Sequence, residues 1–182
     1  MSYRGATVWS FIEQVSSARA APAAGSVTAV AAAMAAALLI KMGRLALRRA
    51  GVSLSHDLVI EAEALRRCLM ANADADAQAY RAAVAVERRG AAESEIEAAW
   101  QEAVTVPLEI AANCQRLLQL AESLQLAGLA AADVQAVTIL ARACLQVQLL
   151  NARANLSRLQ EPAFRQLTQD RLALLEKEES EP

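Results

Sequence analysis

The chain contains few aromatic residues and few of the residues that build tight turns between strands. Of its 182 residues, 3% are aromatic, six are glycine and four are proline. Alanine and leucine supply most of an apolar fraction of 55%, and both are strong helix formers. No stretch alternates apolar and polar residues over the length of a strand. The sequence therefore predicts an all-α fold, a bundle of about five to seven helices.

Residues that bind metals or form disulfides are also scarce. The only histidine is His56, and the three cysteines Cys68, Cys114 and Cys144 lie far apart. No Cys/His pair has the spacing of metal ligands. We expect no bound metal, and we expect the cysteines to be reduced, buried thiols of a cytoplasmic protein.

An excess of charge of either sign is missing as well. The formal net charge is −2, so no global basic field points to a nucleic acid partner. The apolar run 26–40 is shorter than the ~20 residues that cross a bilayer, and Lys41 interrupts it. The N-terminus also lacks the pattern of a signal peptide. We expect a cytoplasmic protein that acts without a membrane or a nucleic acid.

Apolar periodicity divides most of the chain into helices. The expected helices are 7–15, 26 to about 49, 56–73, a run that ends near 88, 93–126 and 133–159. Pro107 either kinks or splits the fifth of these. Breaks are expected at 51–53, at the polar stretch 72–80, at Gly90 and at 127–128. Residues 1–160 are expected to form one domain, and 161–182 a C-terminal helical extension that frays after Leu175.

The segment 22–42 suggests the first wall of a binding site. Pro22 and Gly25 break the preceding helix, and Ser26 offers a side-chain oxygen as the N-cap of the next. A helix that begins with small residues lets its free N–H groups approach a ligand closely. The alanines that follow cover almost every face, which predicts a helix enclosed by others. The excess of apolar surface predicts burial against a second copy, as a homodimer.

Four motifs occur in an order and spacing typical of one family. They are Pro22-x-x-Gly25-Ser26, Asp76-Ala77-Gln78-Ala79-Tyr80, Val106-Pro107-Leu108-Glu109-Ile110-Ala111, and Asp133 leading to Asn151-Ala152-Arg153-Ala154-Asn155-Leu156. From about residue 10 to 159, the chain resembles the cyclodeaminase/cyclohydrolase family. That family includes the C-terminal domain of formiminotransferase-cyclodeaminase and the bacterial methenyltetrahydrofolate cyclohydrolases.

The resemblance implies an all-helical homodimer that binds a reduced folate near the subunit interface. It also implies hydrolysis of 5,10-methenyltetrahydrofolate to 10-formyltetrahydrofolate, or loss of ammonia from 5-formiminotetrahydrofolate, without a metal. Hydration needs a placed water, a carboxylate that accepts its proton, and polar groups that hold the pteridine. The candidate catalytic residues are Asp76 and Asp133. The candidate substrate-binding residues are Gly25, Ser26, Arg88, Asn151 and Asn155.

Departures from the family pattern keep an alternative open. Ala23 and Ala24 stand where the family has glycines, and their methyl groups can displace a ligand or require a φ that alanine disfavours. The alternative is a diverged, non-catalytic paralogue of the same fold that binds folate or another ligand, or that serves as a helical partner subunit. The candidates also have ordinary structural roles. Asp133 can cap a helix, Asp76 can be solvated, and the two asparagines can bond between helices.

Overall fold

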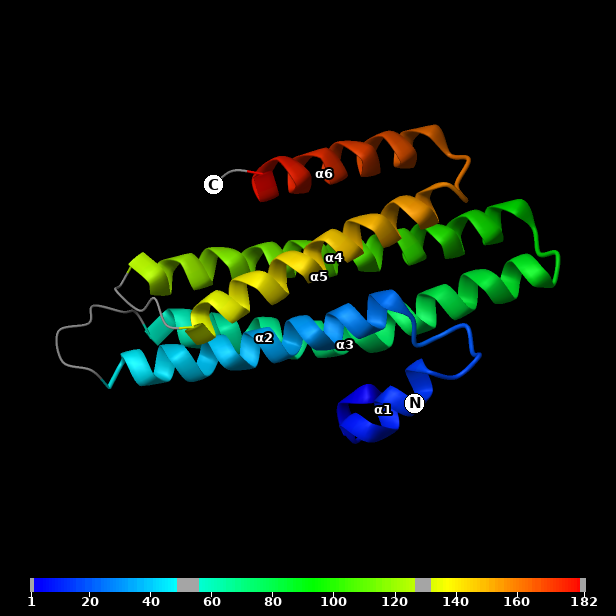
Figure 1. The fold of residues 1–182 in the computed structure, drawn as a ribbon. Helices are drawn as coiled ribbons and strands as arrows, with labels where there is room; N and C mark the ends of the chain where they lie inside the picture. The colour runs from blue at the N-terminus through cyan, green and yellow to red at the C-terminus, as the bar shows by residue number, and fades with distance from the viewer. Residues whose placement is uncertain (1, 49–55, 127–131, 181–182) are drawn as a thin grey trace.

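The computed structural model describes residues 2–48, 56–126 and 132–180, and within them all regular structure is helical (Figure 1). A short 3-10 helix η1 (Tyr3–Gly5) precedes α1 (Val8–Val15), α2 (Ala24–Ala46), α3 (His56–Arg88), α4 (Glu93–Leu126), α5 (Ala132–Leu156) and α6 (Pro162–Ser180). This confirms the predicted all-α class and the number of helices. Helix α2 ends at Ala46, before the C-terminal end expected near Arg49. The breaks expected at 51–53 and 127–128 lie outside the described residues.

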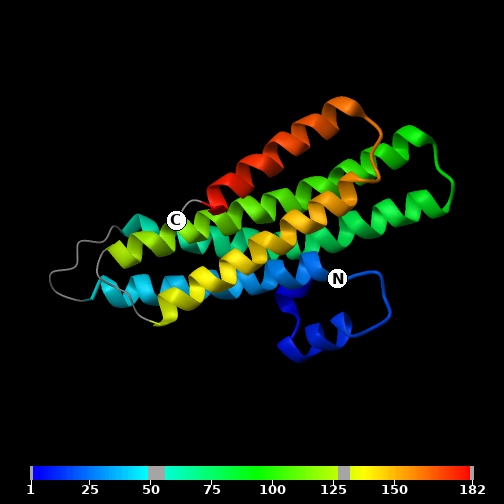
Figure 2. The same ribbon diagram turned by 45° about the horizontal axis from the view of Figure 1, so that its top comes forward.

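Helices α2 to α5 form an antiparallel four-helix bundle, in which the chain reverses direction at each connection (Figures 1 and 2). Helix α2 packs against α3 and α5, and α4 packs against the same two helices on the other side. The core between them is aliphatic. Its largest fully buried side chains include Leu39, Leu69, Ile110, Leu117 and Leu145.

Helix α2 is packed closely because its buried face is made of small residues. Six of its alanines, among them Ala29 and Ala36, are buried. At Gly43 an added Cβ would lie 2.8 Å from Val59 Cγ2 of α3. The enclosure is incomplete, since a narrow strip that includes Met34 stays exposed.

By length and composition α2 also meets the criterion for a membrane span. The most apolar 18-residue stretch within its 23 residues has a mean hydropathy of 1.7, and 56% of that stretch is buried inside the bundle. The helix is thus longer than the apolar run 26–40 of the sequence. The core helix of a bundle passes the same test.

The break predicted at 72–80 is wrong, because α3 runs without interruption from His56 to Arg88. Every second residue from 71 to 79 is alanine, which favours a helix. The aspartates between these alanines have partners outside the helix. Asp74 accepts hydrogen bonds from Ser2 Oγ and from the Tyr3 N–H, both at 2.6 Å. As predicted, the helix ends before Gly90, which has a φ of +64°.

Three further helix boundaries refine the sequence predictions. Helix α4 passes through Pro107 as one element, so the splitting alternative is excluded. Helix α5 begins at Ala132, and Asp133 therefore lies in its first turn instead of capping it. Helix α6 continues to Ser180, beyond the fraying expected after Leu175. An ion pair between Arg153 of α5 and Glu176 holds that later part of α6 to the bundle.

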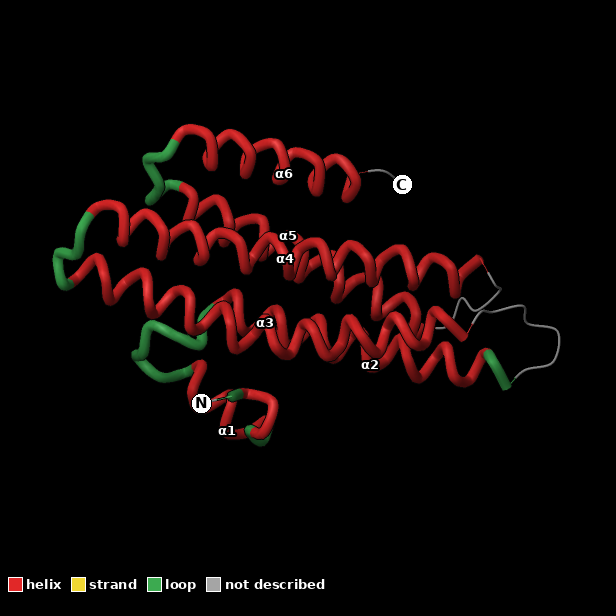
Figure 3. The backbone as a smooth tube through the Cα atoms, turned by 180° about the vertical axis from the view of Figure 1, so that it is seen from behind, coloured by secondary structure: helices red, strands yellow, loops and turns green. Residues whose placement is uncertain are grey.

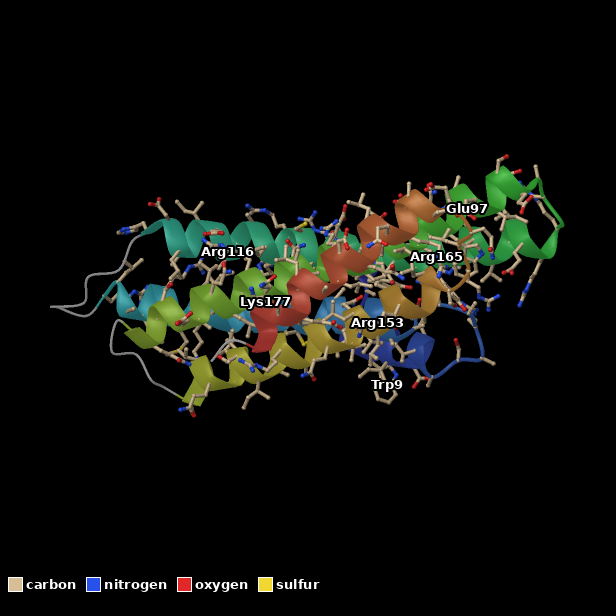
Figure 4. The ribbon with its side chains drawn as sticks, turned by 90° about the horizontal axis from the view of Figure 1, so that it is seen from above. Trp9, Glu97, Arg116, Arg153, Arg165 and Lys177 are labelled. Atoms are coloured by element: carbon tan, nitrogen blue, oxygen red, sulfur yellow. The ribbon has the colours of Figure 1, made fainter. Side chains whose placement is uncertain are left out.

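Seen from above, α6 lies over α4 and α5, which it contacts, and hydrogen bonds hold its N-terminal end to both (Figure 4). Glu97 of α4 accepts hydrogen bonds from the backbone N–H groups of Gln160 and Glu161, in the connection before α6. Arg165 of α6 donates to the carbonyl oxygens of Leu156 and Leu159 at 3.0 and 2.7 Å, and so satisfies the C-terminal end of α5.

The N-terminal segment η1–α1 lies against the outside of α2 and α3 (Figure 3). Tyr3 is buried, and its ring meets the ring of Phe11 edge to face at 5.1 Å. Arg81 of α3 donates to Tyr3 Oη and to the carbonyl oxygen of Ala21, both at 3.2 Å. The segment is thereby tied to the loop that precedes α2.

The three cysteines are free, but only two of them are buried as predicted. Burial raises the pKa of the Cys144 thiol to about 11 and raises the pKa of Cys114 as well. Cys68 is exposed on α3, where its sulfur contacts Asn72 and Asn113 at 3.5 Å. A polar contact between α3 and α4 thus replaces the burial that we expected there.

Candidate active site

The first turn of α2 has no side-chain cap of its own. The helix begins at Ala24, and the residue before it, Ala23, is extended with φ −130° and ψ −163°. The predicted N-cap, Ser26, therefore lies inside the first turn, because the helix begins two residues earlier than expected. The free N–H groups of this turn must find an acceptor elsewhere.

That acceptor is the carboxyl group of Asp76 on α3. The Ser26 hydroxyl donates to Asp76 Oδ2 at 2.7 Å, and the Ser26 backbone N–H also bonds to this carboxyl group. Negative charge is favoured at a helix N-terminus, which suits an ionised Asp76. The contact links the middle of α3 to the start of α2.

Gly25 is the residue that lets Asp76 come so close. A Cβ at this position would lie 2.5 Å from Asp76 Cγ, inside the space that the carboxyl group occupies. Any side chain would therefore push the carboxyl group away from the turn. The glycine of the motif thus has a steric explanation in this fold.

Burial shifts the acidity of Asp76. Desolvation raises the pKa of this carboxyl group above its usual value, and the two bonds from Ser26 offset only part of that rise. A carboxyl group with a raised pKa is a stronger base when ionised, and it holds its proton closer to neutral pH when protonated.

A cavity of about 250 Å³ opens beside Asp76. Its walls come from the loop before α2, the first residues of α2, one face of α3 and the last turns of α5. The lining residues that could contact a ligand through polar groups are Gly25, Asp76, Tyr80, Asn151 and Asn155. Four of the seven predicted site residues thus meet in one cavity, and Ser26 is buried next to it, bonded to Asp76.

Two of the cavity's polar side chains are fixed by neighbours on α4. Asn155 Nδ2 donates to the carbonyl oxygen of Ala103 at 2.6 Å, so this asparagine bonds between helices and lines the cavity as well. The Tyr80 ring meets the Trp100 ring edge to face at 6.0 Å. Both contacts restrict side-chain motion at the wall, which is what a binding site needs.

Gln148 of α5 belongs to this region, although it was not among the predicted residues. It is fully buried, and its Nε2 donates to the Gly25 carbonyl oxygen at 2.9 Å and to Thr28 Oγ1 at 2.6 Å. A signal for it exists in the sequence. Gln148, Asn151 and Asn155 are spaced i, i+3, i+7, so they form one polar stripe on an otherwise apolar helix face.

Two predicted residues lie elsewhere in the chain. Asp133 forms an ion pair with Lys41 at 2.9 Å, and Lys41 is about 24 Å along α2 from Gly25 at 1.5 Å per residue. Arg88 is the exposed last residue of α3 and does not line the cavity. The roles predicted for Asp133 and Arg88 stay predictions.

A second cavity, of about 260 Å³, lies between the η1–α1 segment and helices α2 and α3. It is lined mainly by apolar residues such as Phe11, Met34 and Met70, and it contains no carboxyl group. The cavity beside Asp76 is therefore the better candidate for proton-transfer chemistry. Over the described ranges, no three His, Cys, Asp or Glu side chains are grouped so that they could hold a metal ion.

Comparisons with known proteins agree with the motifs and the fold. The family model described as formiminotransferase-cyclodeaminase matches residues 7–173. The fold is similar to that of formiminotetrahydrofolate cyclodeaminase from Thermotoga maritima, with a TM-score of 0.89 and 24% sequence identity. The match covers 97% of this chain and 91% of that one. No match was found among curated proteins.

Proposed function

The chain belongs to the formiminotransferase-cyclodeaminase family, and from this premise we propose that it acts on the one-carbon unit of a tetrahydrofolate. The finer proposal is hydrolysis of 5,10-methenyltetrahydrofolate to 10-formyltetrahydrofolate. The observation that carries it is the Asp76 carboxyl group, which has a raised pKa and lies at the wall of a polar cavity. We also propose that the protein acts in the cytoplasm.

The hydrolysis requires one group that first accepts a proton and then returns it. Water adds to the electrophilic bridge carbon of the methenyl cation while Asp76 takes a proton from that water. The bond between the bridge carbon and N5 then breaks, and its electron pair returns to N5. Asp76 protonates N5 and accepts the proton of the new hydroxyl group as the formyl C=O forms. One proton leaves to solvent overall, which balances the hydrolysis of a cation to a neutral product.

The polar residues around Asp76 suit the remaining tasks. The side-chain amides of Asn151 and Asn155, together with the Tyr80 phenol, can hydrogen-bond to the heteroatoms of a pteridine ring. An ionised Asp76 also stabilises the cationic substrate directly. These features support binding of the substrate cation close to the base.

Ala23 and Ala24 affect this proposal through space and not through backbone strain. Ala23 is extended, and within the described residues no residue other than glycine has a positive φ. Both alanines line the cavity, where their methyl groups take room that glycines would leave to the ligand. This narrowing is what favours the alternative, a paralogue that binds a folate without turning it over.

Deamination of 5-formiminotetrahydrofolate is the alternative reaction at the same carboxyl group. There N10 attacks the formimino carbon, and the proton of N10 passes to the imino nitrogen. A second proton, delivered by protonated Asp76, lets that nitrogen leave as ammonia when its bond to the carbon breaks, which gives the methenyl cation. The two reactions differ in substrate and not in the residues required. An assay with both substrates separates them.

The test follows loss of the methenyltetrahydrofolate chromophore above its spontaneous rate, and ammonia release from 5-formiminotetrahydrofolate. We expect wild-type protein to accelerate the first reaction, and Asp76→Asn to lower kcat by about 100-fold or more. Asp170→Asn, at an exposed site on α6, is the matched control and should keep full activity. Ammonia release alone would assign the deaminase reaction. No acceleration of either reaction by folded protein, with a folate-induced rise in melting temperature, would establish the binding paralogue.

A homodimer is the assembly that we propose for this protein. The isolated chain leaves large apolar side chains of α1 and α2 in contact with solvent. Val8, Trp9, Ile12 and Met34 are 64%, 70%, 50% and 54% exposed, and we call these four residues the α1–α2 face. Val8 and Met34 line the same apolar cavity, so the face is continuous. Exposed apolar surface of this kind is typical of subunit interfaces.

A further inference from the structure

Gln148 is an unusual residue for the centre of this bundle. Its side chain is completely buried, and its Oε1 is the one buried side-chain polar atom in the described part of the chain without a hydrogen-bond partner. An unsatisfied buried acceptor destabilises a fold, and a methionine or leucine would fill similar space without that cost. Stability therefore does not explain the choice of glutamine at this position.

The donor side of the same amide explains it better. Its Nε2 bonds to two groups in the first turns of α2, the Gly25 carbonyl oxygen and Thr28 Oγ1. Gly25 is the residue against which the Asp76 carboxyl group rests, and Ser26, the next residue, bonds to that carboxyl group twice. Gln148 thus bonds to the same turn of α2 that binds the Asp76 carboxyl group.

We infer that Gln148 is a positioning residue of the proposed reaction, which anchors the first turn of α2 so that the Asp76 carboxyl group stays at the cavity wall. The inference rests on the proposed function, since it assigns Gln148 to that site. Gln148 itself does not line the cavity, so it acts through Gly25 and Ser26 and not on the substrate. A misplacement of the base by about 1 Å is enough to lower a rate by about 100-fold.

The anchor also has a consequence for the ionisation of Asp76. The bonds from Ser26 lower the pKa of Asp76 while burial raises it, so loss of the anchor should let the pKa rise further. The titratable groups that the structure places near this carboxyl group are Tyr3 on η1, which interacts with it electrostatically, and Tyr80, which lines the same cavity. Residues contributed to the cavity by α2 and α5 are uncharged. None of these groups changes in a Gln148 variant.

The test compares Gln148→Met with wild type in activity, pH profile and melting temperature. We expect kcat/KM to fall by about 10- to 100-fold and the acidic limb of the pH profile to move to higher pH. The melting temperature should not fall. The Thr28 hydroxyl keeps its bond to the Ala24 carbonyl oxygen at 2.7 Å, and the orphaned Oε1 is removed. Gln125→Met, at an exposed site on α4, is the control and should match wild type.

A second pair of variants tests the same anchor with less change to the core. Thr28→Val loses the hydroxyl that Gln148 bonds to, whereas Thr28→Ser keeps it. We expect Thr28→Val to lower kcat/KM and to move the acidic limb of the pH profile to higher pH, as in Gln148→Met. Thr28→Ser should keep the wild-type values of both. A lower melting temperature with unchanged kcat/KM and an unchanged pH limb would reduce Gln148 to a structural role and overturn the inference.

A readout without turnover separates this inference from the proposed function. If wild-type protein converts neither folate, the proposed function fails, and the Asp76 carboxyl group is then titrated by its ¹³C chemical shift. A higher titration midpoint in Gln148→Met than in wild type would support the anchor. An identical midpoint in the two proteins would overturn it.

Discussion

Gly25 shows how much of the site depends on the absence of one side chain. An alanine there would place its Cβ 2.5 Å from Asp76 Cγ, and a carboxyl group held by Ser26 cannot yield without breaking that bond. We predict that Gly25→Ala lowers kcat by about 100-fold, because the base is displaced from the cavity wall. Steady-state kinetics check this. Gly5→Ala is the matched control, since a Cβ at Gly5 meets nothing within 4 Å. Equal losses in the two variants would contradict the steric explanation.

The buried Asp76 carboxyl group should lower the free energy of unfolding at neutral pH. Its pKa in the folded chain lies above the usual 3.8, so the native state binds more protons than the unfolded state between those two values. The free energy of unfolding therefore falls as pH rises through that window, and the loss persists above it. We predict that Asp76→Asn melts at a higher temperature than wild type at pH 7, and that the difference shrinks below about pH 4. Melting curves across pH test this. A difference that does not depend on pH would contradict it.

At the scale of elements, an aspartate of α3 helps to hold the N-terminal segment. Asp74 accepts two hydrogen bonds from the start of the chain, and the segment is also held by the Arg81–Tyr3 hydrogen bond and by the contact between Tyr3 and Phe11. We predict that Asp74→Ala destabilises the protein by about 1–3 kcal/mol, because the Tyr3 N–H loses its acceptor. The variant should also be cleaved faster by trypsin after Arg4 or Arg19. Urea unfolding and limited proteolysis measure the two effects. Asp170→Ala, on α6, is the control for loss of a carboxyl group.

Helix α3 also shows where sequence reasoning reached its limit. The aspartates and the asparagine between residues 72 and 80 look like a polar break, because solvated carboxylates are frequent in loops. The partners of the two aspartates, Tyr3 and Ser26, are about 50 to 70 residues away, and no local pattern reveals such contacts. Apolar periodicity predicted the other helices because their burial is set by local spacing.

The candidate site was predictable to a similar degree. Gly25, Asp76, Asn151 and Asn155 were found through motif positions, and the fold brings them to one cavity. Gln148 was missed because a single glutamine on an apolar helix is rarely informative. Its spacing from the two asparagines becomes meaningful only when the start of α2 is known to face it.

At the scale of the whole molecule, the α1–α2 face would be exposed to solvent in a monomer and buried in the proposed homodimer. The chain has two tryptophans: Trp9 is 70% exposed on this face, whereas Trp100 is 3% exposed in the bundle. Since a second copy on the face would remove Trp9 from water, we predict dimers in sedimentation equilibrium and a red shift of Trp9 emission on dilution. Trp100→Phe isolates that signal.

Met34→Glu places a charge in the proposed interface and should yield monomers, because burying an unpaired carboxylate costs several kcal/mol. Leu167→Glu, at an equally apolar and 68% exposed site on α6, is the matched control and should stay dimeric. Dimers that persist in Met34→Glu and dissociate in Leu167→Glu would move the interface to the α6 side of the bundle. Monomers of wild-type protein at every concentration would leave the α1–α2 face without a second copy and contradict the proposed assembly.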